Sequence, residues 1–209
     1  MVFITHFWKS FRRRFDRLSW WLSALLLLIA TNAPASTVEL SDMRVERAEG
    51  ALLLNTTLKL ELGPAVEEAL VKGVPVYFVA EAEVLRDRWY WYDRKVAYVT
   101  RYYRIVYQPL TRQWRLNISA GALSSAGLGG SIAQNFDSLA DALSSMRRQT
   151  GWKLLDLSEL DADARYNLNY RFRLDVSQLP RPFQIAAGSQ TDWSLSLSRN
   201  LRINPDPGR

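Results

Sequence analysis

The sequence predicts an α+β domain that is mainly antiparallel β-sheet, with two helices packed to one side. Strand-like segments arrive in runs instead of alternating strictly with helices, which favours antiparallel pairing. Two segments carry apolar residues at the spacing of an amphipathic helix. Residues 165–176 alternate polar and apolar side chains, so one face of that strand is expected to be buried and the other wet. A β-sandwich with two decorating helices is the alternative.

The first two strands are expected at residues 38–46 and 51–62. Glu49-Gly50 lies between them and is typical of a tight turn. In the second segment, leucines alternate with charged residues, which is the period of a half-buried strand. The two strands are therefore expected to form a hairpin.

A first helix is expected at residues 65–72. Pro64 precedes it, and proline suits the first helical turn because its missing N–H would have no partner there. Gly73 follows at the position where a left-handed cap is expected. The buried face would consist of Val66, Ala69 and Leu70.

Three further strands are expected at residues 74–84, 96–107 and 113–118. The chain must turn between residues 86 and 95, because one straight strand from 74 to 107 would be about 110 Å long. Residues 108–112 form a hairpin loop of ordinary length. Alternation places one set of side chains on the buried face of the first of these strands: Val76, Phe78, Ala80, Ala82 and Val84.

A second helix is expected over residues 137–148, capped by Asn135 or Asp137 and ended by Gly151. Residues 121–131 before it are mostly glycine, alanine and serine, which indicates a mobile loop. This loop lacks the Gly-Lys-Ser/Thr ending of a phosphate-binding loop, so a nucleotide site is not expected.

An acidic, turn-rich segment then leads into the alternating strand at 165–176. The prolines of residues 179–182 interrupt the pattern, and a last strand is expected at 193–197. Residues 201–209 are expected to be a flexible tail. The expected order is β-β-α-β-β-β-α-β-β, in a single domain that spans residues 36–200.

The first 35 residues have the three parts of a secretory signal peptide: a basic segment, an apolar run and small residues before the cut. Cleavage is expected between Ala35 and Ser36. An uncleaved anchor is disfavoured, because a spanning helix needs roughly 20 apolar residues and this run has about half that. Arginines 12–14 also approach the twin-arginine pattern, so both export routes stay open. The protein is expected in the periplasm, with membrane contact only through the leader.

The composition excludes several classes of function. The chain has no cysteine and a single histidine, His6, which lies in the leader. A mature protein without either residue cannot form a Ser-His-Asp triad, a Cys-His pair or a His/Cys metal site. Without the leader, the chain has 22 basic and 20 acidic residues, a balance that does not favour nucleic acid. No cofactor is expected.

Carboxylates are the remaining candidates for catalysis. A glycosidase needs two carboxyl groups about 5–10 Å apart, and two pairs qualify by spacing: Glu81 with Glu83, and Glu67 with Glu68. We favour the interpretation that Glu81 and Glu83 lie on the solvent face of a sheet. An acidic group could suggest calcium, but its spacing does not fit an EF-hand. This group comprises Asp156, Glu159, Asp161 and Asp163.

Residues 86–115 form a basic-aromatic block, with eight cations, nine aromatic residues and only two carboxylates. Arginine binds phosphate and carboxylate bidentately, and aromatic rings offer flat contacts to sugars or cations. The candidate binding residues are Arg86, Arg88, Trp89, Trp91, Arg94 and Lys95. The favoured alternative is structural, since long strands of Tyr, Trp and Arg also pack as cross-strand pairs.

A set of motifs in this chain resembles an uncharacterised family of exported Gram-negative proteins, catalogued as domain of unknown function 4390. The motifs are Gly63-Pro64-Ala65-Val66-Glu67-Glu68-Ala69-Leu70, Gly73-Val74-Pro75, Arg88-Trp89-Tyr90-Trp91-Tyr92-Asp93, the segment from Tyr107 to Trp114, Gly151-Trp152, and the segment from Asp175 to Pro182. The resemblance covers roughly residues 38–198 and implies a periplasmic or envelope protein. It implies no catalytic residue and no ligand.

The sequence therefore favours a non-enzymatic periplasmic protein that binds an envelope component or a protein partner. We expect that partner to be an envelope lipid, a glycan or a membrane protein, and not nucleic acid. The alternative is a carboxylate-dependent hydrolase that acts on envelope glycans.

Overall fold

The computed structural model describes residues 35–88, 93–120, 131–161 and 164–203. The chain divides into two compact units, residues 1–33 and 34–209, and all described residues belong to the second. Apart from Ala35, the expected leader lies outside the described residues. Within them, no helix combines the length and the apolar character that crossing a membrane requires.

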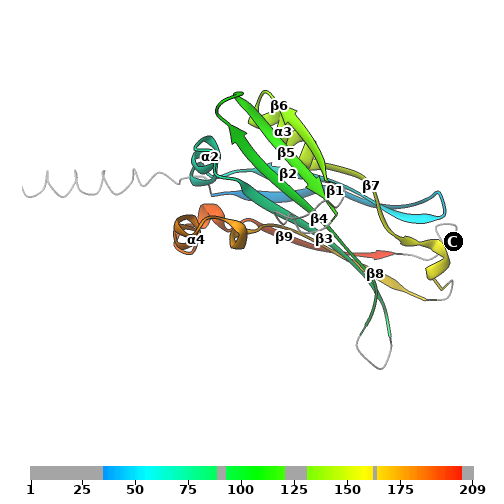
Figure 1. The fold of residues 1–209 in the computed structure, drawn as a ribbon. Helices are drawn as coiled ribbons and strands as arrows, with labels where there is room; N and C mark the ends of the chain where they lie inside the picture. Colours follow the sequence, from blue (N-terminus) through cyan, green and yellow to red (C-terminus); the bar gives the residue numbers. More distant parts are fainter. Residues whose placement is uncertain (1–34, 89–92, 121–130, 162–163, 204–209) are drawn as a thin grey trace, which may run out of the picture. The chain divides into compact units, whose positions relative to one another are not determined.

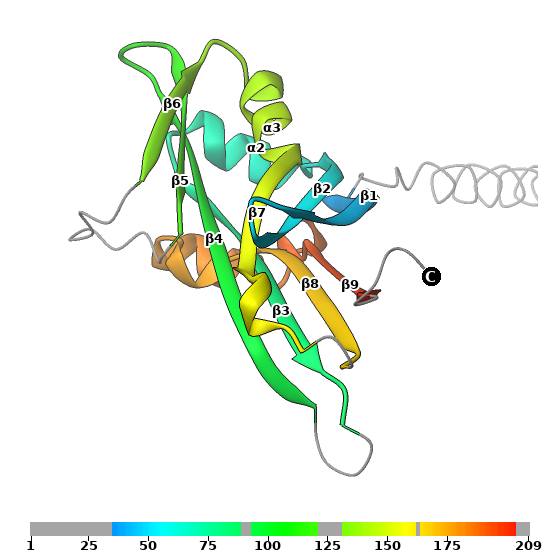
Figure 2. The same ribbon diagram turned by 90° about the vertical axis from the view of Figure 1, so that its right-hand side faces the viewer.

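Two antiparallel sheets make up the described domain (Figures 1 and 2). The smaller has the order β1-β2-β7, with β1 at Thr37–Ala48, β2 at Ala51–Glu61 and β7 at Arg148–Asp156. The larger has the order β6-β5-β4-β3-β8-β9, with β3 at Val76–Arg86, β4 at Arg94–Gln108, β5 at Gln113–Ser119, β6 at Ile132–Phe136, β8 at Tyr166–Leu174 and β9 at Ser196–Ile203. All the pairings between neighbouring strands are antiparallel, as expected.

Three α-helices lie among the described residues: α2 at Pro64–Val71, α3 at Leu139–Arg147 and α4 at Arg181–Ala187. The second of them, α3, lies on the same face of the larger sheet as the smaller sheet (Figure 2) and contacts β2, β5, β6 and β7. The expected α+β class is confirmed. The presence of a second sheet agrees with the β-sandwich alternative, which also has two sheets.

The facing surfaces of the two sheets share one apolar core. The predicted buried face of β3, from Val76 to Val84, is 0% exposed at each alternate position. Phe78 of this face stacks on Phe172 of β8, with ring centroids 5.8 Å apart. Four leucines of β2 belong to the same core: Leu52, Leu54, Leu58 and Leu60. Burial of apolar area on this scale is the main stabilising contribution to the fold.

The turn predicted between β1 and β2 is confirmed. Glu49 and Gly50 have φ angles of 54° and 72°, and Ala48 pairs with Ala51 across them. Two central residues with positive φ are typical of a type I′ turn, whose twist matches that of the flanking strands. Glycine relieves the strain at one of the two positions.

The first helix is also confirmed in its details. Pro64 lies in its first turn, and Val66, Ala69 and Leu70 are buried. Gly73 has φ +80° and its N–H donates to the Leu70 carbonyl at 2.8 Å, while Val74 N–H donates to the Ala69 carbonyl at 3.0 Å. This pattern is a Schellman cap, which satisfies carbonyls that the helix end leaves unpaired.

Three of the described strands and α-helices were not predicted from the sequence. Two are strands, β6 and β7, and the third is α4. In β7, Gly151 has φ +61° and the pairing with β2 shifts register twice, so no regular alternation is visible. The prolines at 180 and 182 suggested a break, but they stand at the start of α4, where proline is tolerated.

Three boundaries are corrected. Ser138 caps α3, not Asn135 or Asp137, because its side chain accepts the Asp141 N–H at 3.1 Å. Gly151 lies inside β7 and does not end α3. The last strand begins at Ser196 and continues to Ile203, three residues into the segment expected to be a tail.

A junction of three distant segments holds the start of α2. Ser36 is buried, accepts the Gly63 N–H at 2.7 Å and donates to the carbonyl of Asp192. The Asp192 carboxylate accepts the Ala65 N–H at 3.0 Å. A Cβ on Gly63 would lie 2.8 Å from Asp192 Cγ and 3.0 Å from its Cβ. Glycine is therefore required here for space, and not for an unusual φ.

Candidate functional site

The described candidate binding residues, Arg86, Arg88, Arg94 and Lys95, lie at the far end of the β3–β4 hairpin, which extends away from the helices (Figure 2). Arg86, the last residue of β3, pairs in register with Arg94, the first residue of β4. Like charges directly opposite one another in a sheet are destabilising. This end of the hairpin therefore concentrates positive charge at a cost that other contacts must offset.

Contacts with the loop before β8 and with the start of β8 supply that compensation. The Arg86 guanidinium forms an ion pair with Asp161. Next to it, Asp87 N–H donates to the Arg165 carbonyl at 2.9 Å, and Asn167 Nδ2 donates to the Asp87 carboxylate. The far end of the hairpin is thus fixed to the start of β8.

The other described cations of this set differ in their contacts. Lys95 Nζ lies 2.7 Å from Glu83 and 5.0 Å from the centre of the Tyr98 ring. The hydrogen bond to Glu83, followed by the attraction of its charge, raises the pKa of Lys95. Arg88 and Arg94 are exposed and form no ion pair with a described residue. Trp89 and Trp91 lie outside the described residues.

The described residues in the rest of the basic-aromatic block do not form one surface. Arg101 points toward the smaller sheet and lies over Trp152, 4.9 Å from its ring centre. Tyr103 is 2% exposed, and Tyr107 packs on Trp114 with ring centroids 4.9 Å apart. On this side of β4 the structural interpretation is therefore the better one. The opposite side carries Tyr98, Tyr102 and Arg104.

Ion pairs engage the carboxylates of β3. Glu81 lies 3.4 Å from Arg173 and 3.9 Å from Arg171, and Glu83 lies next to Lys95. Both carboxylates are on the face of the larger sheet that points away from the smaller one, and their side chains are 17% and 27% exposed. They are cross-strand ion-pair partners rather than groups on open solvent.

Three of the other acidic candidates also have local partners, namely Glu68, Asp156 and Glu159. A hydrogen bond from Lys72 at 2.6 Å lowers the pKa of Glu68. Asp156 and Glu159 cap a short 3-10 helix, η1 (Leu157–Glu159), and Asp156 pairs with Lys153 at 2.7 Å. Asp163 lies outside the described residues. Within the described part of the chain, no three side chains of the metal-ligating types gather in one place.

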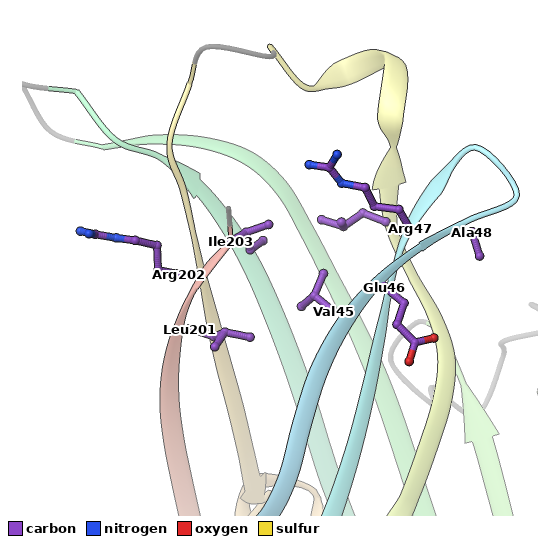
Figure 3. Close-up of a pocket in the computed structure, with 8 residues that line it drawn as sticks. Val45, Glu46, Arg47, Ala48, Leu201, Arg202 and Ile203 are labelled. Atoms are coloured by element: carbon purple, nitrogen blue, oxygen red, sulfur yellow. The ribbon is translucent and has the colours of Figure 1, made fainter. Parts of the chain in front are cut away.

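A pocket of about 570 Å³ opens between the ends of β1 and β9 (Figure 3). Val45, Leu201 and Ile203 point into it, whereas Arg202 points away. The lining also includes Leu52, a core residue. The sequence could not predict this pocket, because its two walls are about 150 positions apart and carry no shared motif.

Asp175 opens the last motif of the resemblance, and its role is structural. Its carboxylate accepts the Ser177 N–H at 3.2 Å, the Ser177 hydroxyl at 2.7 Å and the Gln178 amide at 2.9 Å. Burial alone would raise the pKa of Asp175, but these hydrogen bonds outweigh it and hold the pKa below its ordinary value. The carboxylate thereby caps the 3-10 helix η2 (Val176–Gln178).

Asp175→Ala is expected to lower the free energy of unfolding by about 1 kcal/mol, the usual loss for a capping carboxylate. Because the folded pKa of Asp175 is below its ordinary 3.8, this stabilisation is complete above about pH 4 and is lost as the pH falls further. Urea unfolding at pH 7 and pH 3 measures both effects. Asp175→Asn is the control, since it keeps an acceptor but does not titrate. An equal loss at both pH values would contradict the assignment.

The fold defines a two-sheet α+β domain with a basic end on its β3–β4 hairpin. A family model described as "Domain of unknown function (DUF4390)" matches residues 35–202. The chain belongs to this family, as the motifs indicated. No curated protein and no solved structure matches the chain.

Proposed function

We propose that this protein is a non-enzymatic, exported envelope module that binds an envelope component or a protein partner through the end of the β3–β4 hairpin. The observation that supports the proposal is the pairing of Arg86 with Arg94. Arg88 and Lys95 add two more cations within a few residues. Arg86 already pairs with Asp161, so among the described residues the exposed guanidiniums of Arg88 and Arg94 are the groups that can bind a phosphate or carboxylate bidentately.

The composition of the chain after residue 35 supports a binding role over a catalytic one. It contains neither cysteine nor histidine, the residues on which most nucleophilic and metal-dependent catalysis relies. The hydrolase alternative would need a free carboxylate pair. Both candidate carboxylates of β3 are instead engaged by basic side chains of neighbouring strands.

Changing Arg86, Arg88, Arg94 and Lys95 to serine is expected to weaken binding to phosphatidylglycerol vesicles at least about tenfold, since each cation near an anionic surface contributes about 1 kcal/mol. Co-sedimentation with vesicles measures it, with phosphatidylcholine vesicles as the neutral reference. Lipopolysaccharide is a second probe with the same phosphate chemistry. Raising the salt concentration should weaken the wild-type interaction in the same direction.

The matched control removes the same charge elsewhere. Arg44, Lys59, Lys72 and Lys153 are exposed and each pairs locally with a carboxylate. Their change to serine alters the net charge equally and is expected to leave vesicle binding close to wild type. Equal losses in both variants would show an effect of net charge alone. Absence of wild-type binding to either probe would remove the anionic-surface version of the proposal.

A further inference from the structure

The unprotected edge of a β-sheet is a potential pairing site, because alternate N–H and C=O groups of an edge strand have no partner. In the described part of the chain the smaller sheet ends in β1 and β7, and the larger sheet ends in β6 and β9. Soluble proteins usually protect such edges with charged side chains, bulges or proline. The four edges differ sharply in this protection.

Three of the edges are protected. In β1 the register shifts between Leu40 and Asp42, and many of its side chains are charged. In β7 the pairing shifts twice and Gly151 has a left-handed conformation. In β9, Arg199 and Arg202 are exposed on the edge strand. Pairing of β9 with itself about the midpoint of residues 200 and 201 would place Arg199 opposite Arg202 twice.

The remaining edge, β6, has none of these features. Its five residues, Ile-Ala-Gln-Asn-Phe, include no charge and no proline, and they pair with β5 in unbroken register. Ile132 is 62% exposed although it is a large apolar residue. The face of β6 that carries Ile132, Gln134 and Phe136 is supported by α3, since Ser145 donates to the Gln134 side chain at 3.1 Å. Among the described residues, this edge is therefore regular, supported by α3 and without a neighbouring strand.

We propose that β6 is the docking edge for a second copy of this chain. Antiparallel pairing of two β6 strands about Gln134 would place Ile132 opposite Phe136 of the partner subunit, and would do so twice by symmetry. Ala133 would lie opposite Asn135 in the same way. Ile132 and Phe136 share one face of the strand, so each pair brings two apolar side chains together. No charge meets a like charge, and the larger sheets of the two copies become continuous.

The length of β6 sets the strength of this association. Five residues extend about 17 Å, and specific stable complexes bury roughly 1,200–2,000 Å² in total. A single short strand pair falls below that range. The expected dimer is therefore weak, with half of the chains paired only at roughly 0.1–1 mM.

Sedimentation equilibrium of the chain as purified from cells, up to about 1 mM, tests the proposal. The expected result is a mass that rises from monomer toward dimer with concentration. Ile132→Lys is expected to abolish the rise, because a lysine would replace the apolar contact at both ends of the pairing. The matched control is Leu110→Lys, which makes the same chemical change at a fully exposed position in the β4–β5 turn.

Amide NMR shifts give a second measurement that does not depend on a variant. Their change with concentration is expected to be largest at residues 132–136. A monomer at all concentrations would overturn the proposal. A dimer that persists in a folded Ile132→Lys variant would also overturn it. So would concentration-dependent shifts that map to another edge. Binding of an unrelated peptide to β6 by a chain that stays monomeric would overturn it as well.

Discussion

Gly63→Ala is expected to destabilise the fold by about 2 kcal/mol, the usual cost of a buried steric overlap. The added methyl would lie 2.8 Å from Asp192 Cγ, and Asp192 cannot move away without breaking its hydrogen bond to the Ala65 N–H. That bond satisfies one of the unpaired donors at the start of α2. Urea unfolding followed by circular dichroism measures the change.

A double-mutant cycle with Asp192→Gly separates the steric effect from a general glycine-to-alanine effect. Asp192→Gly removes both the Cβ and the carboxylate that the methyl would meet. In that background, Gly63→Ala is expected to cost only a few tenths of a kcal/mol. An interaction energy close to zero would contradict the role of the junction, because contacting residues normally show coupling of 0.5–3 kcal/mol.

Alkaline pH is expected to produce the second large effect. Tyr103 and Tyr170 are buried between the two sheets. Burial raises the pKa of Tyr103 to about 12 and also raises the pKa of Tyr170. Unfolded tyrosine titrates near 10, so the unfolded chain loses these protons first. Stability is therefore complete below about pH 10 and falls as the pH rises toward 12, on the order of 2–3 kcal/mol for Tyr103 alone.

Urea unfolding at a series of pH values from neutral to strongly alkaline measures this loss. Tyr103→Phe is the matched variant, since it removes the titrating hydroxyl but keeps the ring. The centroid of this ring lies 6.4 Å from that of Phe172. Its stability is expected to depend less steeply on alkaline pH than that of the wild type. Identical slopes in the two proteins would show that Tyr103 does not titrate as its burial requires.

The elements that could be predicted are those whose signal is local. The turn at Glu49-Gly50, the caps of α2 and the alternation of β8 each reside in a few adjacent residues, and the structure confirms them. Two strands, β6 and β7, were not predicted, for different reasons. All but the last residue of β6 is exposed, so it has no buried face to reveal it, and bulges interrupt the pattern of β7.

The candidate site was predictable only in part. The presence of cations near the hairpin follows from the sequence, and so does a reversal between residues 86 and 95. The pairing of Arg86 with Arg94 does not, because a register shift between Val84 and Leu85 sets which residues oppose one another. The contact of Arg86 with Asp161 joins segments 75 positions apart and needed the folded chain.

The hydroxyl bond of Ser36 to Asp192 spans 156 positions of the sequence, and this separation governs how the chain can fold. Proteins rich in such distant contacts have high contact order and fold slowly, since large loops must close before the contacts form. A chain is made from its N-terminus, so β1 and β2 appear long before η3 (Thr191–Trp193) and β9. The first hairpin must therefore wait for nearly the whole chain before its final contacts exist.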